Sequence, residues 1–186
     1  MQAQVLEGGF ADLPIDASYA FRAVMTAMAR PGDIVDVSGA KPPSPMSVAA
    51  GVVVLTLCDP ETPIHLALSH DMPQVRDWIT FHTGAPFVAA QDAMFALGAW
   101  DALSLADFPL GTAEYPDRSA TVIVERQSLS HDGVVMRGPG IKEKTTLSLP
   151  DTRAFETNAA QFPLGLDFIF TCDDRLAALP RTTRVG

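Results

Sequence analysis

The stretch Leu166-Asp167-Phe168-Ile169-Phe170-Thr171-Cys172 decides the fold of this chain. A short, strongly apolar run that ends at turn residues is typical of a buried strand. Asp173-Asp174 follows it directly and turns the chain, so that residues 176–179 can return as a second strand. The sequence therefore predicts that the last third of the chain contributes strands to the centre of a sheet.

Helices are predicted on the N-terminal side of this strand. Apolar residues fall near helical spacing over residues 16–30, where Asp16 is the expected N-cap and Pro31-Gly32 the stop. The run over residues 48–57 contains three consecutive valines, which would suit a strand. Its length and a cap from Ser44 or Ser47 favour a buried helix instead.

The remaining elements alternate along the chain. Further helices are predicted over residues 71–81, capped by Asp71 and closed by Gly84, over 102–107, and over 150–161, capped by Asp151. Strands are predicted over residues 34–37, 64–68, 87–88, 94–97, 120–126 and 134–137, the last two separated by the turn signal His131-Asp132-Gly133. This alternation predicts a single α/β domain over residues 1–186, with a mixed β-sheet flanked by helices.

The composition points to a protein–protein interface. Apolar residues make up 47% of the chain, and only 19% are charged, against a usual value of about 25%. No uninterrupted apolar run reaches the roughly 18 residues of a membrane span. We therefore expect the surplus apolar surface to meet other proteins, and the isolated chain to form a homodimer.

Charge and cysteine content exclude further classes of function. A net charge of −9 argues against nucleic-acid binding, which requires a basic face. Cys58 and Cys172 lie in apolar runs without a second ligand at metal spacing, so we expect buried reduced thiols and no metal site. Residues 1–10 lack the basic start and apolar run of a signal peptide, which leads us to expect a cytoplasmic protein.

The turn-like stretch Gly138-Pro139-Gly140-Ile141-Lys142 is the best candidate for anion binding. Gly138 and Gly140 expose backbone N–H groups, and Lys142 could add positive charge. The stretch lacks the ending of a P-loop and the spacing of a dinucleotide loop, and Pro139 removes one donor. A tight turn after a strand is the favoured interpretation.

Two further residues are candidates for binding. His82 follows a predicted helix and could act in acid–base chemistry, although a histidine that satisfies the helix C-terminus is favoured. Arg181, in Leu179-Pro180-Arg181-Thr182-Thr183-Arg184, could hold an anion, although an arm that docks on a partner is slightly favoured. No catalytic residue is assigned, because the common nucleophile and metal motifs are absent from the sequence.

Several of these segments, taken in order, resemble the PhnH family, the H subunit of the bacterial carbon–phosphorus lyase system. They are Phe21-Arg22 through Ala27-Met28, Arg30-Pro31-Gly32, Leu55-Thr56-Leu57 with Asp59, Thr62-Pro63, Phe81-His82-Thr83 with Ala85-Pro86, Gly138 to Ile141, Phe162-Pro163-Leu164-Gly165 with Asp167, Thr171-Cys172 and Leu179 to Thr183. They extend over nearly the whole chain. Each is weak alone, but their common order is specific.

The resemblance implies a function in phosphonate catabolism. The family is associated with the formation of ribose 1-methylphosphonate 5-triphosphate from ATP and methylphosphonate. Its implied partners are the G, I, J and L subunits, of which J cleaves the carbon–phosphorus bond. The resemblance also implies a fold similar to that of pyridoxal-phosphate-dependent transferases, without use of that cofactor.

The lysines agree with the implied lack of pyridoxal phosphate. An enzyme that uses this cofactor requires a lysine to form its Schiff base. Lys41 lies in a proline-rich loop, and Lys142 and Lys144 flank Glu143 in a charged segment. None of them has the apolar surroundings that would lower the pKa of its ammonium group.

Three functional hypotheses follow. The leading one is a structural or interaction subunit of a phosphonate-processing transferase complex, which is not catalytic alone. The alternative is a subunit that contributes phosphate-binding residues to a shared active site, through Gly138, Gly140, Lys142 and Arg181. The third and weakest is a free-standing cysteine or pyridoxal enzyme.

Overall fold

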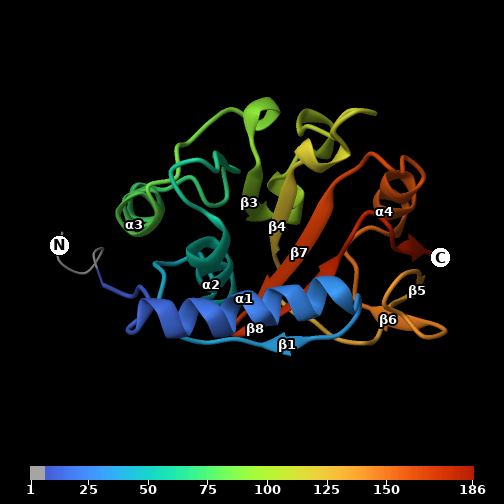
Figure 1. Cartoon of the computed structure of the whole chain (residues 1–186), viewed down its shortest axis with the longest axis horizontal. Coiled ribbons are helices and arrows are strands. Elements are labelled where there is room, and N and C mark those ends of the chain that lie inside the picture. The colour runs from blue at the N-terminus through green and yellow to red at the C-terminus, as the bar shows by residue number, and fades with distance from the viewer. Residues whose placement is uncertain (1–6) are drawn as a thin grey trace.

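The computed structural model describes residues 7–186, so the expectation about a signal peptide falls mainly on residues outside this range. It shows a six-stranded mixed sheet in the order β1-β8-β7-β4-β3-β2 and a separate three-stranded sheet in the order β6-β5-β9 (Figure 1). The large sheet comprises β1 (Val35–Asp36), β2 (Ile64–Leu66), β3 (Phe95–Ala99), β4 (Thr121–Glu125), β7 (Asp167–Cys172) and β8 (Arg175–Leu179). The helices are α1 (Leu13–Ala29), α2 (Val48–Leu57), α3 (Pro73–Thr83) and α4 (Thr152–Ala159). The predicted α/β class with a mixed sheet and flanking helices is confirmed.

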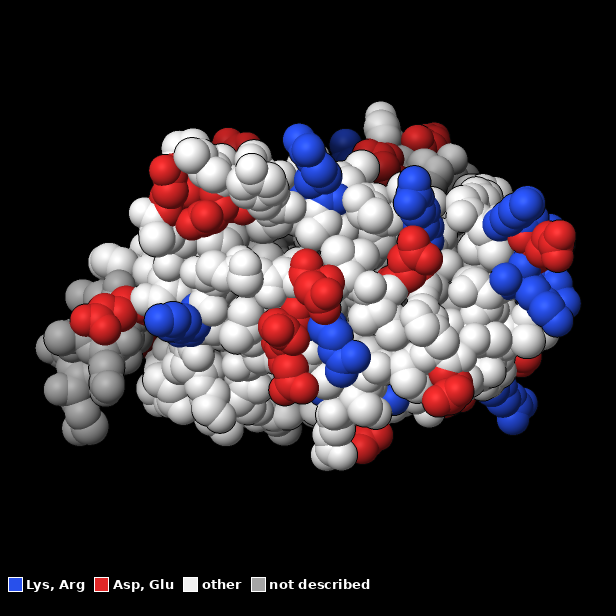
Figure 2. Space-filling view, turned by 90° about the horizontal axis from the view of Figure 1, so that it is seen from below, with Lys and Arg blue, Asp and Glu red and all other residues white. Residues whose placement is uncertain are grey.

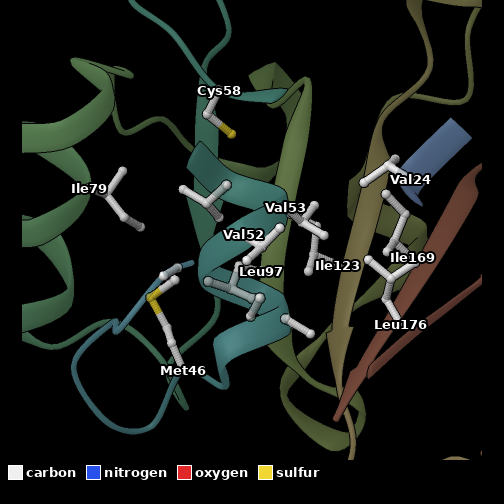
Figure 3. Close-up of a cluster of buried hydrophobic side chains, with 14 of the residues drawn as sticks. Val24, Met46, Val52, Val53, Cys58, Ile79, Leu97, Ile123, Ile169 and Leu176 are labelled. Atoms are coloured by element: carbon white, nitrogen blue, oxygen red, sulfur yellow. The ribbon is translucent and has the colours of Figure 1, made fainter. Parts of the chain in front are cut away.

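Strands β2, β3, β4 and β7 run parallel, and β8 and β1 extend the sheet antiparallel. In this register Ile123 of β4 aligns with Leu97 of β3 and with Ile169 of β7. All three side chains are buried on the face that α1, α2 and α3 cover. The register therefore places one continuous apolar row across the sheet under these helices (Figure 3).

Helix α2 lies at the centre of this layer and is apolar on every side. Its residues from Ala49 to Val54 are all buried, and it contacts α1, α3, β7 and β8. The Ser47 hydroxyl accepts a hydrogen bond from the Ala50 N–H at 3.1 Å, which confirms the predicted N-cap. Burial on all sides explains why no amphipathic spacing is visible in this segment.

The opposite face of the sheet carries an aromatic cluster. Phe155 of α4 contacts Phe168 and Phe170 of β7, with ring centroids 4.9 and 5.7 Å apart. Helix α4 begins at the predicted cap, where the Asp151 carboxylate accepts from the Ala154 N–H. Hydrogen bonds also connect α4 to the start of β7. The buried Asn158 side-chain amide donates to the Leu166 carbonyl and accepts from the Leu166 N–H.

The turn signal at residues 131–133 does not connect two strands that pair with each other. The first strand, β4, has β3 and β7 on its two edges and leaves no edge free. The second, β5 (Val134–Arg137), pairs antiparallel with β6 (Thr145–Leu147) and β9 (Arg184–Val185) in the small sheet. Strands β6 and β9 were not predicted, because three and two residues are too short to show a pattern.

Two predicted helix caps also differ. The N-cap of α1 is Asp12, whose carboxylate accepts from the Ile15 N–H, whereas Asp16 lies within the first turn. Helix α3 starts at Pro73, and Asp71 instead forms an ion pair with Arg76. Gly84 ends α3 in the left-handed region, at a φ of 69°, as predicted.

No helix within residues 7–186 is both long and apolar enough to cross a membrane. The surface below the sheet, on the side of α1 and β1, carries acidic and basic side chains singly or in small groups, with broad uncharged areas between them (Figure 2). Helix α1 adds exposed apolar side chains, among them Tyr19, Phe21 and Met25. These features agree with the low charge content of the sequence.

Candidate functional site

The structure brings together three of the five sequence-predicted binding residues. Gly140 and Arg181 line one hollow of about 490 Å³, together with Met28, Phe162 and other residues. Gly138 lies in the same turn, where a Cβ would lie 3.1 Å from the carbonyl oxygen of Thr182 and 3.2 Å from the Cα of Thr183. The C-terminal segment and the turn after β5 are therefore neighbours, although more than 35 residues separate them in sequence.

The glycine turn itself is a packing element. The Ile141 N–H donates to the Gly138 carbonyl at 3.2 Å, and both glycines have positive φ. A Cβ at Gly140 would lie 1.9 Å from the carbonyl oxygen of Ala29, at the end of α1. The turn therefore needs glycine for close backbone contact, which agrees with the favoured interpretation of a tight turn.

Arg181 is held by protein groups on most sides. Its guanidinium donates to both carboxylate oxygens of Asp167, at 3.3 and 2.6 Å, and to the carbonyl of Pro116 at 2.6 Å. The Arg181 N–H also donates to Asp167, and both side chains are about 15% exposed. Arg181 thus connects the start of β7 to the 3₁₀ helix η5 (Pro116–Arg118). The Asp167 carboxylate compensates the charge of Arg181.

His82 and Lys142 lie elsewhere. His82 is in the last turn of α3, where its ring contacts Trp78 at 4.8 Å and Phe81 at 4.9 Å. Gly9 packs against the same ring, and burial lowers the pKa of His82, against the opposing effect of a hydrogen bond that the ring donates to the backbone of Glu7. The ring is thus a half-buried packing group whose charged form is disfavoured. Lys142 is exposed in the loop between β5 and β6.

A second group of polar residues, which the sequence did not single out, gathers at the carboxyl ends of the parallel strands. Ser69 and His70 follow β2, Glu125 ends β4, and Asp173 follows β7. Helix α2 begins at the same edge, because the Ala49 N–H donates to the Asp173 carbonyl at 2.9 Å. In open α/β sheets this edge is where ligands bind.

Glu125 is the central acid of this group. Its carboxylate accepts from the Ser47 N–H at 3.0 Å, and its side chain is only 13% exposed. Burial raises the pKa of Glu125 to about 7, although hydrogen bonds from Ser47 and Thr171 act in the opposite direction. The negative charge of Asp173 raises this pKa further.

His70 extends the group toward β2 and β3. Ser69 Oγ lies 2.9 Å from His70 Nδ1 and also accepts from the Ala99 N–H at 3.0 Å. The Ser69 hydroxyl can therefore donate to Nδ1, which leaves the proton of the neutral ring on Nε2, 4.0 Å from a Glu125 oxygen. Burial lowers the pKa of His70, whose side chain is 2% exposed. Burial thus disfavours the charged forms of both His70 and Glu125.

The cysteines are buried, as expected. Burial raises the pKa of Cys58 to about 12, and the nearby charge of Asp59 adds to the effect. Burial also raises the pKa of Cys172, with a further contribution from Asp173. Within residues 7–186 no three His, Cys, Asp or Glu side chains are grouped to hold a metal ion.

One signal in the sequence could have found the carboxyl-edge group. Residues that directly follow parallel strands meet at one edge of the sheet, and Ser69-His70 and Glu125-Arg126 occupy such positions. The inference required the strands to be known as parallel and adjacent. The turn signal at residues 131–133, between the strands predicted over 120–126 and 134–137, gave no indication of this parallel pairing.

Comparison with known proteins identifies the class. The sequence profile of a family described as "Bacterial phosphonate metabolism protein (PhnH)" matches residues 8–186. The chain is 40% identical over 195 residues to "Alpha-D-ribose 1-methylphosphonate 5-triphosphate synthase subunit PhnH" of Rhizobium meliloti (strain 1021), with 99% of this chain and 97% of the relative covered. It is 30% identical over 199 residues to "Putative C-P lyase subunit protein HtxG" of Stutzerimonas stutzeri, with 97% and 96% covered. The chain belongs to the PhnH family, and the resemblance seen in its sequence motifs is confirmed.

We predict that Arg181→Ala lowers the free energy of unfolding by about 2–3 kcal/mol, because it leaves the nearly buried Asp167 carboxylate without its cation. Urea unfolding of the purified chain measures this. Adding Asp167→Asn to Arg181→Ala should recover part of the loss, since the uncompensated charge is removed. Arg153→Ala, at an exposed position on α4, is the matched control. Equal losses in the single and double variants would contradict a coupled pair.

We predict that Glu125→Gln stabilises the protein at alkaline pH. Since the folded pKa of Glu125 is raised to about 7 from an ordinary 4.5, its contribution is fully present below pH 4.5 and is lost as pH rises through 7. The loss approaches roughly 3 kcal/mol. Urea unfolding of both proteins from about pH 5 to about pH 8 should show the advantage of Glu125→Gln growing with pH.

His70 acts in the opposite direction, since a lowered pKa removes stability as pH falls below 6.5. That effect appears at acid pH, whereas the loss predicted for Glu125 grows toward pH 8, so the two are separated by their pH ranges. The exposed Glu143→Gln serves as the control and should show no growing advantage. A difference between wild type and Glu125→Gln that does not change with pH would show that Glu125 is solvated.

Proposed function

We propose that this protein is the H-type subunit of a complex that forms ribose 1-methylphosphonate 5-triphosphate during phosphonate catabolism. The observation that carries the proposal is the 40% identity, over 99% of the chain, to a relative named as a subunit of that synthase. A second relative is named as a carbon–phosphorus lyase subunit. The partners are then the other subunits of the system, of the G, I, J and L types.

The role within the complex is mainly structural. The thiols of Cys58 and Cys172 and the imidazole of His70 are buried, and His82 packs between aromatic rings. The alternative role, in which Arg181 lends charge to a shared phosphate site, is less well supported because Asp167 already compensates that charge. The exposed apolar side chains of α1 provide surface for partner subunits.

The decisive experiment omits this chain from a reconstituted synthase. We expect the remaining subunits, given ATP and methylphosphonate, to lose product formation, and addition of the purified chain to restore it. Product is measured by phosphorus NMR. Arg181→Ala separates the two roles: a variant that assembles but turns over slowly would support the shared-site alternative. Full product formation without the chain would contradict the proposal.

We further propose a fold related to that of the pyridoxal-phosphate-dependent transferases, without the cofactor. All three lysines, Lys41, Lys142 and Lys144, are exposed, which does not favour a buried Schiff base. The purified chain mixed with pyridoxal phosphate should show no aldimine absorbance. A stoichiometric lysine adduct after borohydride treatment would overturn this prediction.

The isolated chain is proposed to form a homodimer in the cytoplasm. The exposed apolar residues of α1 and the sparse charges beside it support self-association (Figure 2). Free thiols at Cys58 and Cys172 agree with a reducing compartment. Light scattering should give twice the 19.8 kDa chain mass, and Phe21→Glu should shift the protein to monomer. A monomeric wild type at micromolar concentration would contradict the dimer.

A further inference from the structure

A hollow of about 370 Å³ opens at the carboxyl ends of β3 and β4. A volume of this size lies in the range of small-ligand cavities. Its polar and aromatic lining comes from two segments, Trp100 and Asp101 after β3, and Glu125, Arg126, Gln127 and Ser128 at and after β4. None of the residues predicted from sequence contributes to it.

After β2 and after β3 the chain leaves the sheet toward opposite faces. After β2 the chain passes to α3, whose Trp78 and Ile79 join the core on the α2 side. After β3 the chain passes to the other side, where Trp100 and Leu103 pack against the core that contains Phe155. The connections thus diverge between β2 and β3, and the hollow at β3 and β4 lies one strand away from that switch point, at the same carboxyl edge of the sheet.

Arg126 lines this hollow, and one donor atom of its guanidinium lies beneath the surface without a partner within residues 7–186. Its backbone is fixed, since its N–H donates to the Thr171 carbonyl at 2.8 Å. Its Nε is buried and has no acceptor among the residues that the structure describes. Because this atom is buried, a ligand in the hollow would be held by the terminal nitrogens of the guanidinium, whose fork of donors suits paired oxygens.

The charges around Arg126 decide which oxygens these are. Asp101 is an exposed carboxylate, and Glu125 has its pKa near neutrality. The lining therefore has no net positive charge, which disfavours a free phosphate or phosphonate dianion. A hydroxyl group suits it better, because a hydroxyl accepts from a guanidinium and donates to a carboxylate at once.

Trp100 adds an apolar wall to these polar groups. Its ring is held by Phe155, with centroids 5.0 Å apart, and therefore has a fixed position at the hollow. An indole beside carboxylates and a guanidinium is suited to a ring that is apolar on its faces and hydroxylated at its edge. Sugars have that character.

We propose that this hollow binds a ribosyl group, with the cis-diol of the sugar hydrogen-bonded by Arg126 and Asp101 and the ring placed against Trp100. The sugar class comes from the lining, and the choice of ribose rests on the proposed function. Carboxylates recognise ribose hydroxyls in dinucleotide-binding folds in the same way. The site takes the neutral sugar, and the phosphate groups of a ribosyl compound lie outside it.

Tryptophan fluorescence of the full chain tests the proposal, because the chain has only two tryptophans and Trp78 is fully buried in the other core. D-ribose and adenosine should each give a saturable change that is lost in Trp100→Phe. 2′-Deoxyadenosine should bind at least about tenfold more weakly, since it lacks one hydroxyl of the diol. Asp101→Asn and Arg126→Met should weaken adenosine binding similarly, whereas the exposed Arg153→Met should not.

Three outcomes would overturn the proposal. Equal affinity for adenosine and 2′-deoxyadenosine would show recognition of the base rather than the diol. Competition by inorganic phosphate would show an anion site. No change with either ribosyl compound at millimolar concentration, in a wild type that restores synthase product formation, would remove the ribose site and leave the proposed function intact. Circular dichroism of the Asp101 and Arg126 variants excludes loss of binding through unfolding.

Discussion

Strand β7 carries apolar side chains on both faces, and the rest of the structure is arranged to cover them. Ile169 points into the layer of α1, α2 and α3, whereas Phe168 and Phe170 point into the layer that contains α4. The strand also pairs on both edges, with β4 and β8. Because each of these side chains contributes about 1.5–3 kcal/mol when buried, neither layer can be removed without exposing a large part of the core. This constraint fixes a three-layer arrangement in so short a chain.

The same strand places the polar chemistry of the molecule. Where β7 ends, Asp173 adopts a positive φ of 52°, and its carbonyl accepts from the first turn of α2. Helix α2 thereby starts beside Glu125, whose carboxylate accepts from the Ser47 N–H. Hydrogen bonds from the start of α2 hold the carboxyl group of Glu125 in the interior. Burial nevertheless raises the pKa of Glu125. The carboxyl edge of the sheet is thus the place where the core ends and where His70, Glu125 and Asp173 gather.

Sequence alone predicted what depends on local patterns. The strand of residues 167–172, the return strand after it, the all-apolar helix with its Ser47 cap and the Asp151 cap all depend on neighbouring residues, and the structure has each of them. The family was also recognisable, because its motifs keep their order. What failed depends on residues far apart. A turn signal at residues 131–133 could not show that β4 already had two partners, or that β5 would pair with the two-residue strand β9.

The candidate sites show the same division. Gly140 and Arg181 were chosen for their chemistry, and they do share a hollow, but only the folded chain shows that Asp167 compensates the charge of Arg181. Arg126 and Asp101 have ordinary sequence surroundings and were not chosen. The interest of Arg126 arises from its buried Nε without an acceptor in the described part of the chain, and that of Asp101 from its place beside the same hollow, and a linear pattern contains neither.

The burial of α2 has a consequence for the synthesis of the protein. This helix leaves the ribosome early, yet the strands β7 and β8 that it packs against are made near the C-terminus. Until they emerge, a segment that is apolar on all sides has no sheet to cover it, and long-range strand pairing is slow to form. The nascent chain therefore exposes apolar surface during most of translation, and we expect ribosome-associated chaperones to bind it.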